Sequence, residues 1–158
     1  MGKLQQEIRK REPFATAEQE AALGLFRTSD RMQHRFARLF REYGLTPSQY
    51  NILRILRGEG KPMPCLEIAQ RTITVVPGIT GLIDRLADAG FVTRQRSEED
   101  RRVVNVSITP AGEEVLARLD QPLVELHKRL LADFSTAELA ELIRLLDKAR
   151  RACEGESS

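Results

Sequence analysis

The chain has 158 residues, which is long enough for one domain with a substantial apolar core. Its 25 basic and 23 acidic side chains give a formal net charge of +2, which permits a nucleic-acid partner but does not require one. No apolar run approaches the roughly 18 residues of a membrane span, and the first residues lack the apolar centre of a signal peptide. We therefore expect a cytoplasmic protein with no membrane partner.

The first third of the chain is expected to form two helices. Thr16 and Gln19 make a capping-box pair at the start of a helix over residues 16–43, and Gly44 follows as its C-terminal stop. Apolar or small residues recur along this helix at spacings of three and four, which is typical of one buried face. Thr46 caps a second helix that is apolar enough to be mostly buried.

Two shorter helices are expected next. The first covers residues 65–71, after a connection that contains two prolines. Thr74 can cap the second, with Pro77 in its first turn, and Gly90 ends it.

A hairpin follows these helices. Residues 91–96 and 103–108 alternate in the manner of β-strands, and residues 97–102 form the turn between them. In the second strand the apolar side chains occupy the even-numbered positions, so they share one side of the sheet.

Two helices are expected to complete the chain. Thr109 and Pro110 predict the start of a helix that runs to about Leu131. Ser135 and Glu138 form a capping box at the start of the last helix.

This order predicts a mainly α (α+β) fold. Residues 45–110 are three short helices and a two-stranded hairpin, the pattern of a winged helix-turn-helix lobe. In that arrangement one helix enters the major groove of DNA and the hairpin reaches the backbone or the minor groove. Such folds also mediate protein contacts, so a protein-interaction module remains the alternative.

The flanking helices indicate a dimer. Residues 16–44 and 112–153 carry apolar stripes that the central lobe does not need for its own core. Intertwining with the same helices of a second copy would bury these stripes, and the two-fold symmetry would then require a roughly palindromic DNA site. The alternative is a monomer whose helices fold back onto themselves.

The central segments resemble the multiple-antibiotic-resistance regulator (MarR) family. The resemblance is carried by LTPSQYNILRIL, LEIAQRT, ITGLIDRLADAGFVTR and EEDRRVVNVSITPAG, which together run from residue 45 to residue 112. It implies a single MarR-type domain over residues 1–158, and a homodimeric DNA-binding regulator that responds to a ligand. We expect a repressor that is relieved by a small-molecule effector and that recognises a pseudo-palindromic operator.

The turn of the hairpin is the most distinctive part of this resemblance. In the family, the Asp-x-Arg pattern, here Asp100 and Arg102, lets the arginine enter the minor groove while the aspartate holds it in position. Arg94, Arg96 and Arg101 are then phosphate contacts or pairs on the strand surface. The competing interpretation is a solvated tip whose charges contribute only solubility.

The expected recognition helix is less typical. Family members often carry a polar or basic side chain where this chain has Gly81, so we expect modest base readout and more reliance on the hairpin and on DNA shape. Arg85 either touches phosphate or pairs with an acid, and Gln70 and Arg71 are further phosphate candidates. The residues of this helix predicted to contact double-stranded DNA are Thr74, Pro77, Gly78, Thr80, Gly81 and Arg85.

The resemblance also implies an effector pocket between the dimerisation helices and the DNA-binding lobe, often for a small aromatic or phenolic compound. The candidate lining residues are Met32, Phe36, Tyr50 and Asn51, and the competing interpretation is ordinary core. A row of arginines on the first long helix would suit a carboxylate or DNA, although a solvated basic face is the favoured interpretation. The members of this row are Arg27, Arg31, Arg35 and Arg38.

Other chemistry has little support in the sequence. Cys65 and Cys153 show no CxxC spacing, and with only two histidines they make no metal cluster, so we expect no metal and no cofactor. A redox role for Cys65 is a weaker alternative. No paired carboxylates, nucleophile elbow or glycine-rich phosphate loop is present, so we do not expect an enzyme.

Overall fold

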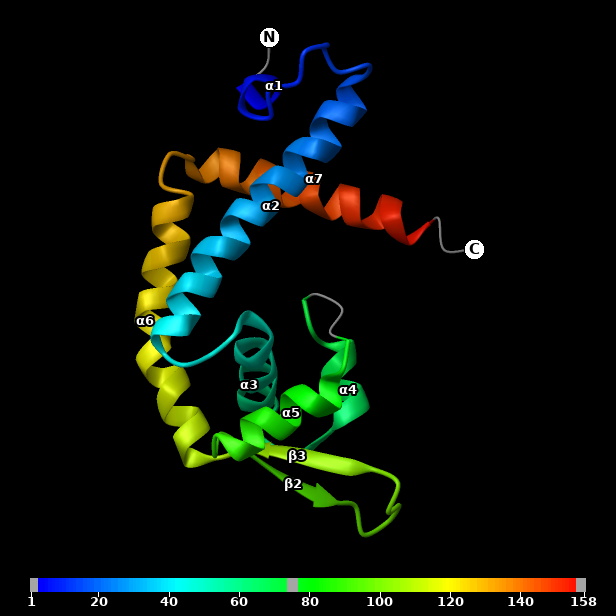
Figure 1. The fold of residues 1–158 in the computed structure, drawn as a ribbon, viewed down its shortest axis with the longest axis vertical. Coiled ribbons are helices and arrows are strands. Elements are labelled where there is room, and N and C mark those ends of the chain that lie inside the picture. Colours follow the sequence, from blue (N-terminus) through cyan, green and yellow to red (C-terminus); the bar gives the residue numbers. More distant parts are fainter. Residues whose placement is uncertain (1–2, 74–76, 156–158) are drawn as a thin grey trace. The chain divides into compact units, whose positions relative to one another are not determined.

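The computed structural model describes residues 3–73 and 77–155, which form helices and one small antiparallel sheet (Figure 1). The described residues up to Leu123 form one compact unit, and those from Val124 form a second. The elements are α1 (Lys3–Glu7), α2 (Ala17–Glu42), α3 (Pro47–Glu59), β1 (Met63–Pro64), α4 (Cys65–Gln70), α5 (Ile79–Asp88), β2 (Val92–Arg96), β3 (Val104–Ile108), α6 (Pro110–Leu130) and α7 (Thr136–Glu154). The mainly helical α+β class is confirmed.

The predicted starts of α2, α3 and α7 are confirmed. The Thr16 hydroxyl accepts the Gln19 N–H at the start of α2, but the Gln19 side chain accepts from the Ala15 N–H and not from that of Thr16, so this predicted capping box is only half formed. Thr46 and Gln49 form a reciprocal capping box at the start of α3. Ser135 forms the same box with the side chain and N–H of Glu138 at the start of α7. These contacts satisfy N–H groups that otherwise lack partners in the first helical turn.

The sheet has the strand order β1-β3-β2, with both pairs antiparallel. Arg94 lies opposite Val106 and Arg96 lies opposite Val104, so the two arginines share a sheet face with these valines. After the buried Val92, every residue of β2 is exposed, so the burial of this strand does not alternate as predicted. The sequence did not predict β1, which is only two residues long and pairs Met63 with Val106. Pro64 is tolerated there because the strand lies at an edge.

The core of the first unit lies between α3, α4, α5, the sheet and the first turns of α6. On β3, Val106 is fully buried, and it lies beside the buried Val92 on the same sheet face. Ten other side chains of this core are exposed by no more than 1%: Ile52, Leu53, Leu56, Met63, Ile68, Ile83, Leu86, Val115, Leu116 and Leu119. This core holds α5 and the hairpin in a fixed relation.

The start of α5 differs from the prediction. The helix begins at Ile79, and Gly78 is its N-cap with φ of +71°, a left-handed conformation that glycine adopts without strain. Pro77 therefore precedes the helix, and the prediction that it lies in the first turn was wrong. The predicted cap Thr74 lies outside the described residues.

Close contact between the sheet and α6 depends on Thr109 and Gly112. The Thr109 hydroxyl donates to the Gly90 carbonyl at 2.6 Å and accepts the Gly112 N–H at 3.2 Å. A Cβ added to Gly112 would lie 2.7 Å from Ile108 Cγ1 and closer still to the Phe91 carbonyl oxygen. Only glycine lets the first turn of α6 approach the hairpin this closely.

The outer helices expose apolar side chains. Phe26 of α2 is 70% exposed, with Leu23 and Leu25 also exposed on this helix. In α7 no residue is buried, and Ile143 is 60% exposed. Among the described residues, no helix combines the length and apolarity that crossing a membrane requires.

Candidate nucleic-acid interface

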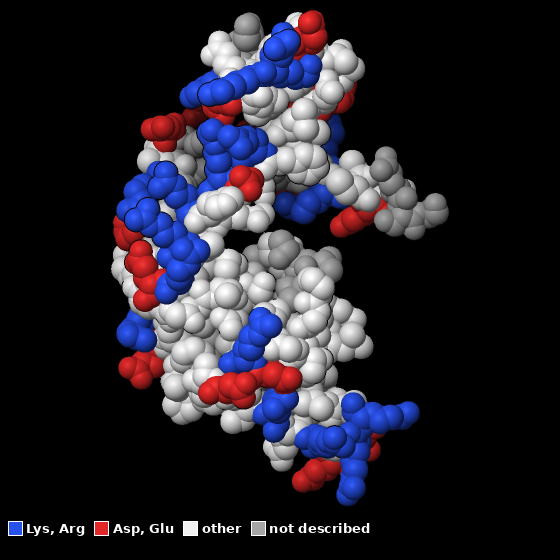
Figure 2. Space-filling view, in the orientation of Figure 1, with Lys and Arg blue, Asp and Glu red and all other residues white. Residues whose placement is uncertain are grey.

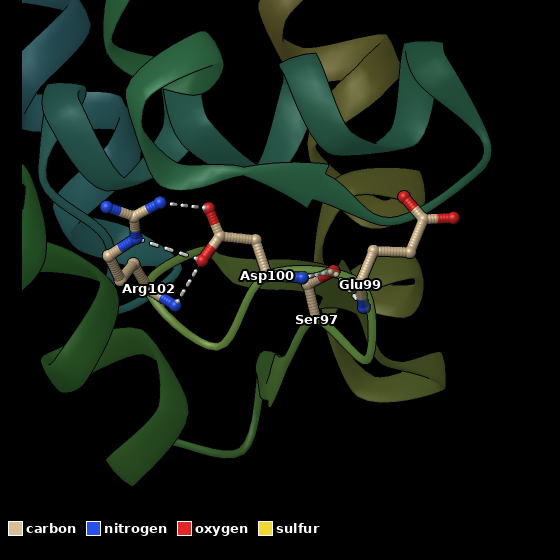
Figure 3. A network of polar contacts seen from close by, with 4 residues as sticks. All are labelled: Ser97, Glu99, Asp100 and Arg102. Carbon is tan, nitrogen blue, oxygen red and sulfur yellow. Dashed lines mark hydrogen bonds and ion pairs between the residues drawn. The ribbon is translucent and has the colours of Figure 1, made fainter.

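The hairpin tip presents an arginine that a neighbouring aspartate holds in position (Figure 3). Asp100 Oδ1 accepts the Arg102 backbone N–H at 3.0 Å and the Arg102 Nε at 3.1 Å, while Oδ2 accepts from a terminal guanidinium nitrogen at 3.3 Å. The Arg102 side chain is nevertheless 91% exposed. The pair therefore orients a guanidinium without covering it.

The turn itself is fixed by local hydrogen bonds. The Ser97 hydroxyl accepts the N–H of Glu99 at 3.2 Å, and the Ser97 N–H donates to the Val103 carbonyl at 2.9 Å. The Val103 N–H donates to the Asp100 carbonyl at 2.9 Å. Serine and aspartate favour such turns because their short side chains bond to nearby backbone groups.

The charge state of Asp100 suits this role. The guanidinium and the N–H of Arg102 both hydrogen-bond to the carboxylate, and they hold the pKa of Asp100 below its usual value. The carboxylate therefore stays ionised at neutral pH and keeps its charge-assisted contact with Arg102.

A second ion pair joins the hairpin to α5. Arg94 of β2 pairs with Asp84 of α5, so Arg94 takes the role of a surface pair, one of its two predicted alternatives. Arg71 is also engaged, since it bonds Glu59 at 2.7 Å and pairs with Glu67. These three ion pairs connect neighbouring segments of the lobe, and each contributes at most about 1 kcal/mol.

Other arginines of the lobe are open to a partner. Arg85, Arg96 and Arg101 are exposed, and none makes a hydrogen bond or ion pair through its side chain with residues 3–73 or 77–155. Figure 2 shows Lys and Arg side chains gathered, with acidic ones between them, over the hairpin tip. These exposed guanidinium groups can neutralise phosphates.

The predicted recognition helix presents a surface poor in side chains. Thr80, Gly81 and Arg85 of α5 are exposed, as are Pro77 and Gly78 before it. Gly81 and Arg85 are four residues apart and share one helix face, opposite the buried Ile83. An added Cβ at Gly81 would meet nothing within 4 Å, so packing within the chain does not require glycine there.

Two of the four candidate effector residues, Phe36 and Tyr50, belong to an aromatic layer, in which Tyr50 and Phe40 are part of the core and Phe36 packs against it. The rings of Phe40 and Tyr50 stack with centroids 4.3 Å apart, and Phe36 lies 6.4 Å from Phe40. Tyr50 is buried, while Met32, Phe36 and Asn51 are partly buried. The structure therefore places Phe36 and Tyr50 in one aromatic layer.

The remaining residues considered are possible metal ligands and the Cys65 thiol. Within the described part of the chain, no cluster of three or more His, Cys, Asp or Glu side chains could hold a metal ion. Burial raises the pKa of the Cys65 thiol, which lowers the thiolate fraction that oxidation requires.

The chain is similar to known transcription regulators, both in sequence and in fold. The MarR family model matches residues 45–104. A transcriptional regulator of the HTH type from Bacillus subtilis is 36% identical over 104 residues, which is 66% of this chain and 73% of the relative. The homoprotocatechuate degradative operon repressor of Escherichia coli is 27% identical, with 82% of this chain and 80% of the relative covered. The crystal structure of a MarR transcription factor from Planctomyces limnophilus matches with 44% identity and a TM-score of 0.67, over 85% of this chain and 98% of that one.

Proposed function

Because the chain belongs to the MarR family of DNA-binding transcription regulators, we propose that it is a homodimeric repressor of a pseudo-palindromic operator. A small aromatic or phenolic effector releases the DNA in this proposal. The similar proteins are transcription regulators and not enzymes.

The observation that carries the DNA-binding part is the paired and exposed Arg102. A planar, permanently charged and weakly hydrated guanidinium suits the narrow minor groove. Asp100 fixes two of its nitrogens, which reduces the conformational freedom lost when the arginine binds. Arg96, Arg101 and Arg85 supply phosphate contacts, and Thr80, Gly81 and the backbone at Pro77 and Gly78 supply the contacts of α5.

The dimer is supported by apolar surface on the outer helices. Phe26, Leu25 and Leu23 on α2, with Ile143 and Leu145 on α7, are exposed in the single chain. Burial of this surface against a second copy would stabilise the dimer by roughly 25 cal/mol for each Å² removed from water. A two-fold dimer carries two lobes, which accounts for a palindromic operator.

The part of the proposal that concerns the effector is based on the aromatic layer of Phe36, Phe40 and Tyr50. Met32, Phe36, Tyr50 and Asn51 are the proposed lining residues, and the relative that represses an operon for homoprotocatechuate degradation supports the repressor role.

Footprinting on DNA that flanks the coding sequence, followed by affinity measurements over a range of salt, tests the proposal. A dimer that contacts several phosphates in each half-site should lose about a thousandfold in affinity between 50 and 200 mM salt. Light scattering on the free protein should give the mass of two chains. A single-chain particle, or binding without preference for any sequence, would contradict the proposal.

A further inference from the structure

One face of α2 carries a row of arginines. Their side chains are exposed and lie within about a third of the helix circumference, because an α-helix has about 3.6 residues per turn. The helix rises by about 21 Å from the first of them to the last. We call this face the arginine stripe, and its members are Arg27, Arg31, Arg35, Arg38 and Arg41.

The stripe carries an excess of positive charge. Within residues 3–73 and 77–155, Arg31 pairs with Glu7 of α1 at 2.9 Å, and the other four members make no hydrogen bond or ion pair through their side chains. Asp30 borders the stripe, 3.6 Å from His34, and Glu42 lies beyond its C-terminal end. In Figure 2, basic side chains gather along α2, apart from those at the hairpin tip. A surface of this kind attracts an anionic partner.

The opposite face of α2 is already packed. Phe40 belongs to the core and Phe36 packs against it, and both lie on the side of the helix that faces away from the stripe. A helix that binds a membrane surface must insert its apolar face, and here that face is covered by the core. Leu25 and Phe26, which we assign to the dimer, also lie away from the stripe. The stripe is therefore open to a polar, anionic partner.

The geometry of the stripe suits a straight and stiff polyanion. Because α2 is one continuous helix of 26 residues, it holds the five cations on a rigid rod. One strand of B-DNA carries a phosphate every 3.4 Å or so along the axis, so the stripe spans roughly six phosphates. A guanidinium can bind one phosphate through two parallel N–H bonds. A flexible acidic polypeptide would lose conformational entropy on such a rod, whereas a DNA duplex is already stiff.

We propose that the arginine stripe binds the phosphate backbone of a second DNA duplex while α5 and the hairpin hold the first. The two contacts use different residues, because the predicted operator contacts lie on α5 and the hairpin and the stripe lies on α2. Binding at one DNA site raises the effective concentration of neighbouring DNA, so a weak second contact gains importance. The inference goes beyond the proposed function, since it assigns a second contact that does not depend on DNA sequence.

Glu7 opposes this contact, because its carboxylate competes with phosphate for Arg31. Glu7→Gln should therefore strengthen the binding of the second duplex, by up to about fivefold for an exposed ion pair. Glu18→Gln is the matched control, because it removes the same charge from the side of α2 opposite the stripe. A gain in affinity cannot arise from a variant that fails to fold.

A two-step capture assay on the full-length protein tests the proposal. An immobilised duplex with the footprinted sequence first captures the protein, and a fluorescent duplex of unrelated sequence is then added. The stripe variant combines three substitutions: Arg27→Gln, Arg35→Gln and Arg38→Gln. Its control removes the same charge from exposed positions near the end of α7: Lys148→Gln, Arg150→Gln and Arg151→Gln. Thermal unfolding and light scattering show whether each variant keeps its fold and its mass.

The captured wild-type protein should bind the second duplex, and the stripe variant should bind it about tenfold more weakly, the expected effect of losing three exposed ion pairs. The dependence of log affinity on log salt concentration should become shallower by about 2.7, because each phosphate contact contributes about 0.9. The α7 control should bind the second duplex as the wild type does. Capture on the first duplex should be the same for all variants.

The proposal is overturned if the captured protein binds no second duplex, or if the stripe variant and the α7 control bind it equally. Equal affinities of Glu7→Gln and Glu18→Gln would also contradict it. Polyglutamate that displaces the second duplex at an equal concentration of charge would assign the stripe to acidic polypeptides instead of DNA. Failure of the first capture step would contradict the proposed function alone, and anisotropy of the fluorescent duplex with free stripe variant and free α7 control then tests the stripe.

Discussion

At the scale of single residues, Asp100 and Arg102 divide two tasks between them. In the proposed interface Arg102 carries the charge that binds DNA, and Asp100 restricts where that charge can lie. An acid beside DNA opposes non-specific binding, because it repels every phosphate regardless of sequence. We therefore expect the pair to favour binding with Arg102 inside a groove over non-specific contact with the phosphate backbone.

Replacing these two residues should have different effects on DNA binding. Arg102→Ala should weaken operator binding by about tenfold or more, because a hydrogen-bonding charge is lost from the groove. Asp100→Asn should lower the ratio of operator to non-specific affinity, because it releases Arg102 and removes a repulsive charge. Fluorescence anisotropy on operator and scrambled duplexes measures both affinities. Arg144→Ala, at an exposed pair on α7, is the control, and unchanged operator binding by Arg102→Ala would remove the hairpin from the mechanism.

The pH dependence of this contact follows from the direction of the Asp100 pKa. Arg102 holds the folded-state pKa below the unfolded value, so the contact is fully formed above the unfolded pKa and is lost as the pH falls through the folded one. In Asp100→Asn this carboxylate no longer titrates. Affinity titrations from neutral pH into the acid range should therefore show a smaller change in operator preference for Asp100→Asn than for the wild type.

Two helical glycines should respond to alanine with opposite signs. Gly112→Ala should destabilise the fold by about 1–3 kcal/mol, because its Cβ would overlap Ile108 and the Phe91 carbonyl. Gly81→Ala should stabilise it by up to about 1 kcal/mol, because alanine loses less conformational entropy in a helix and the site is open. Chemical denaturation measures both changes in the free energy of unfolding.

The same Gly81→Ala variant also tests why α5 lacks a side chain at this position. If the glycine allows the helix backbone to approach DNA closely, the more stable variant should bind the operator more weakly. Unchanged or tighter binding would show that the DNA leaves room for a methyl group at Gly81.

At the scale of elements, the Asp84–Arg94 pair joins the two predicted DNA-contacting elements of the lobe. Asp84→Asn removes the pair, while Asp88→Asn removes the same charge from an exposed position on the same helix. Both variants remove one negative charge from α5 and so reduce the repulsion of DNA to a similar extent. The difference between their operator affinities therefore measures the effect of the Asp84–Arg94 ion pair. An exposed ion pair contributes up to about 1 kcal/mol, so we expect operator affinity up to about fivefold lower in Asp84→Asn than in Asp88→Asn. Equal operator affinities of the two variants would show that the ion pair has no influence on DNA binding.

The elements that the sequence predicted are those that local contacts determine. The capping boxes of α3 and α7 join residues three apart, and spacing alone revealed them. The Asp100–Arg102 contact joins residues two apart, and it was predicted from the resemblance to the MarR family. The strand β1 escaped prediction because its two residues become a strand only by pairing with β3. The start of α5 was wrong because the left-handed Gly78 separates Pro77 from the helix.

The residues that the sequence did not single out depend on tertiary contacts. The Asp84–Arg94 pair joins a helix to a strand, and the Arg57–Asp120 pair joins α3 to α6 across 63 residues of sequence. A pattern of charges along a chain does not show which acid pairs with which arginine.

At the scale of the whole molecule, the proposed dimer predicts that a charge added to α7, far from the DNA-binding lobe in sequence, should weaken DNA binding. Ile143 is exposed on α7, so glutamate at this position should leave the single chain folded but should place a charge in an apolar interface between copies. Ala152→Glu is the control, because Ala152 is also exposed and lies nine residues along the helix, about two and a half turns away and on the opposite side. Both substitutions add the same charge to the same helix.

Only the Ile143→Glu variant should change both the mass measured by light scattering and the operator affinity measured by titration. Ile143→Glu should shift the protein towards the mass of one chain and lose most of its operator affinity, because a single lobe contacts half of the phosphates. Ala152→Glu should remain dimeric and bind as the wild type does. A monomeric Ile143→Glu variant with undiminished affinity would show that one lobe suffices, and a palindromic operator would then have no physical basis in this protein.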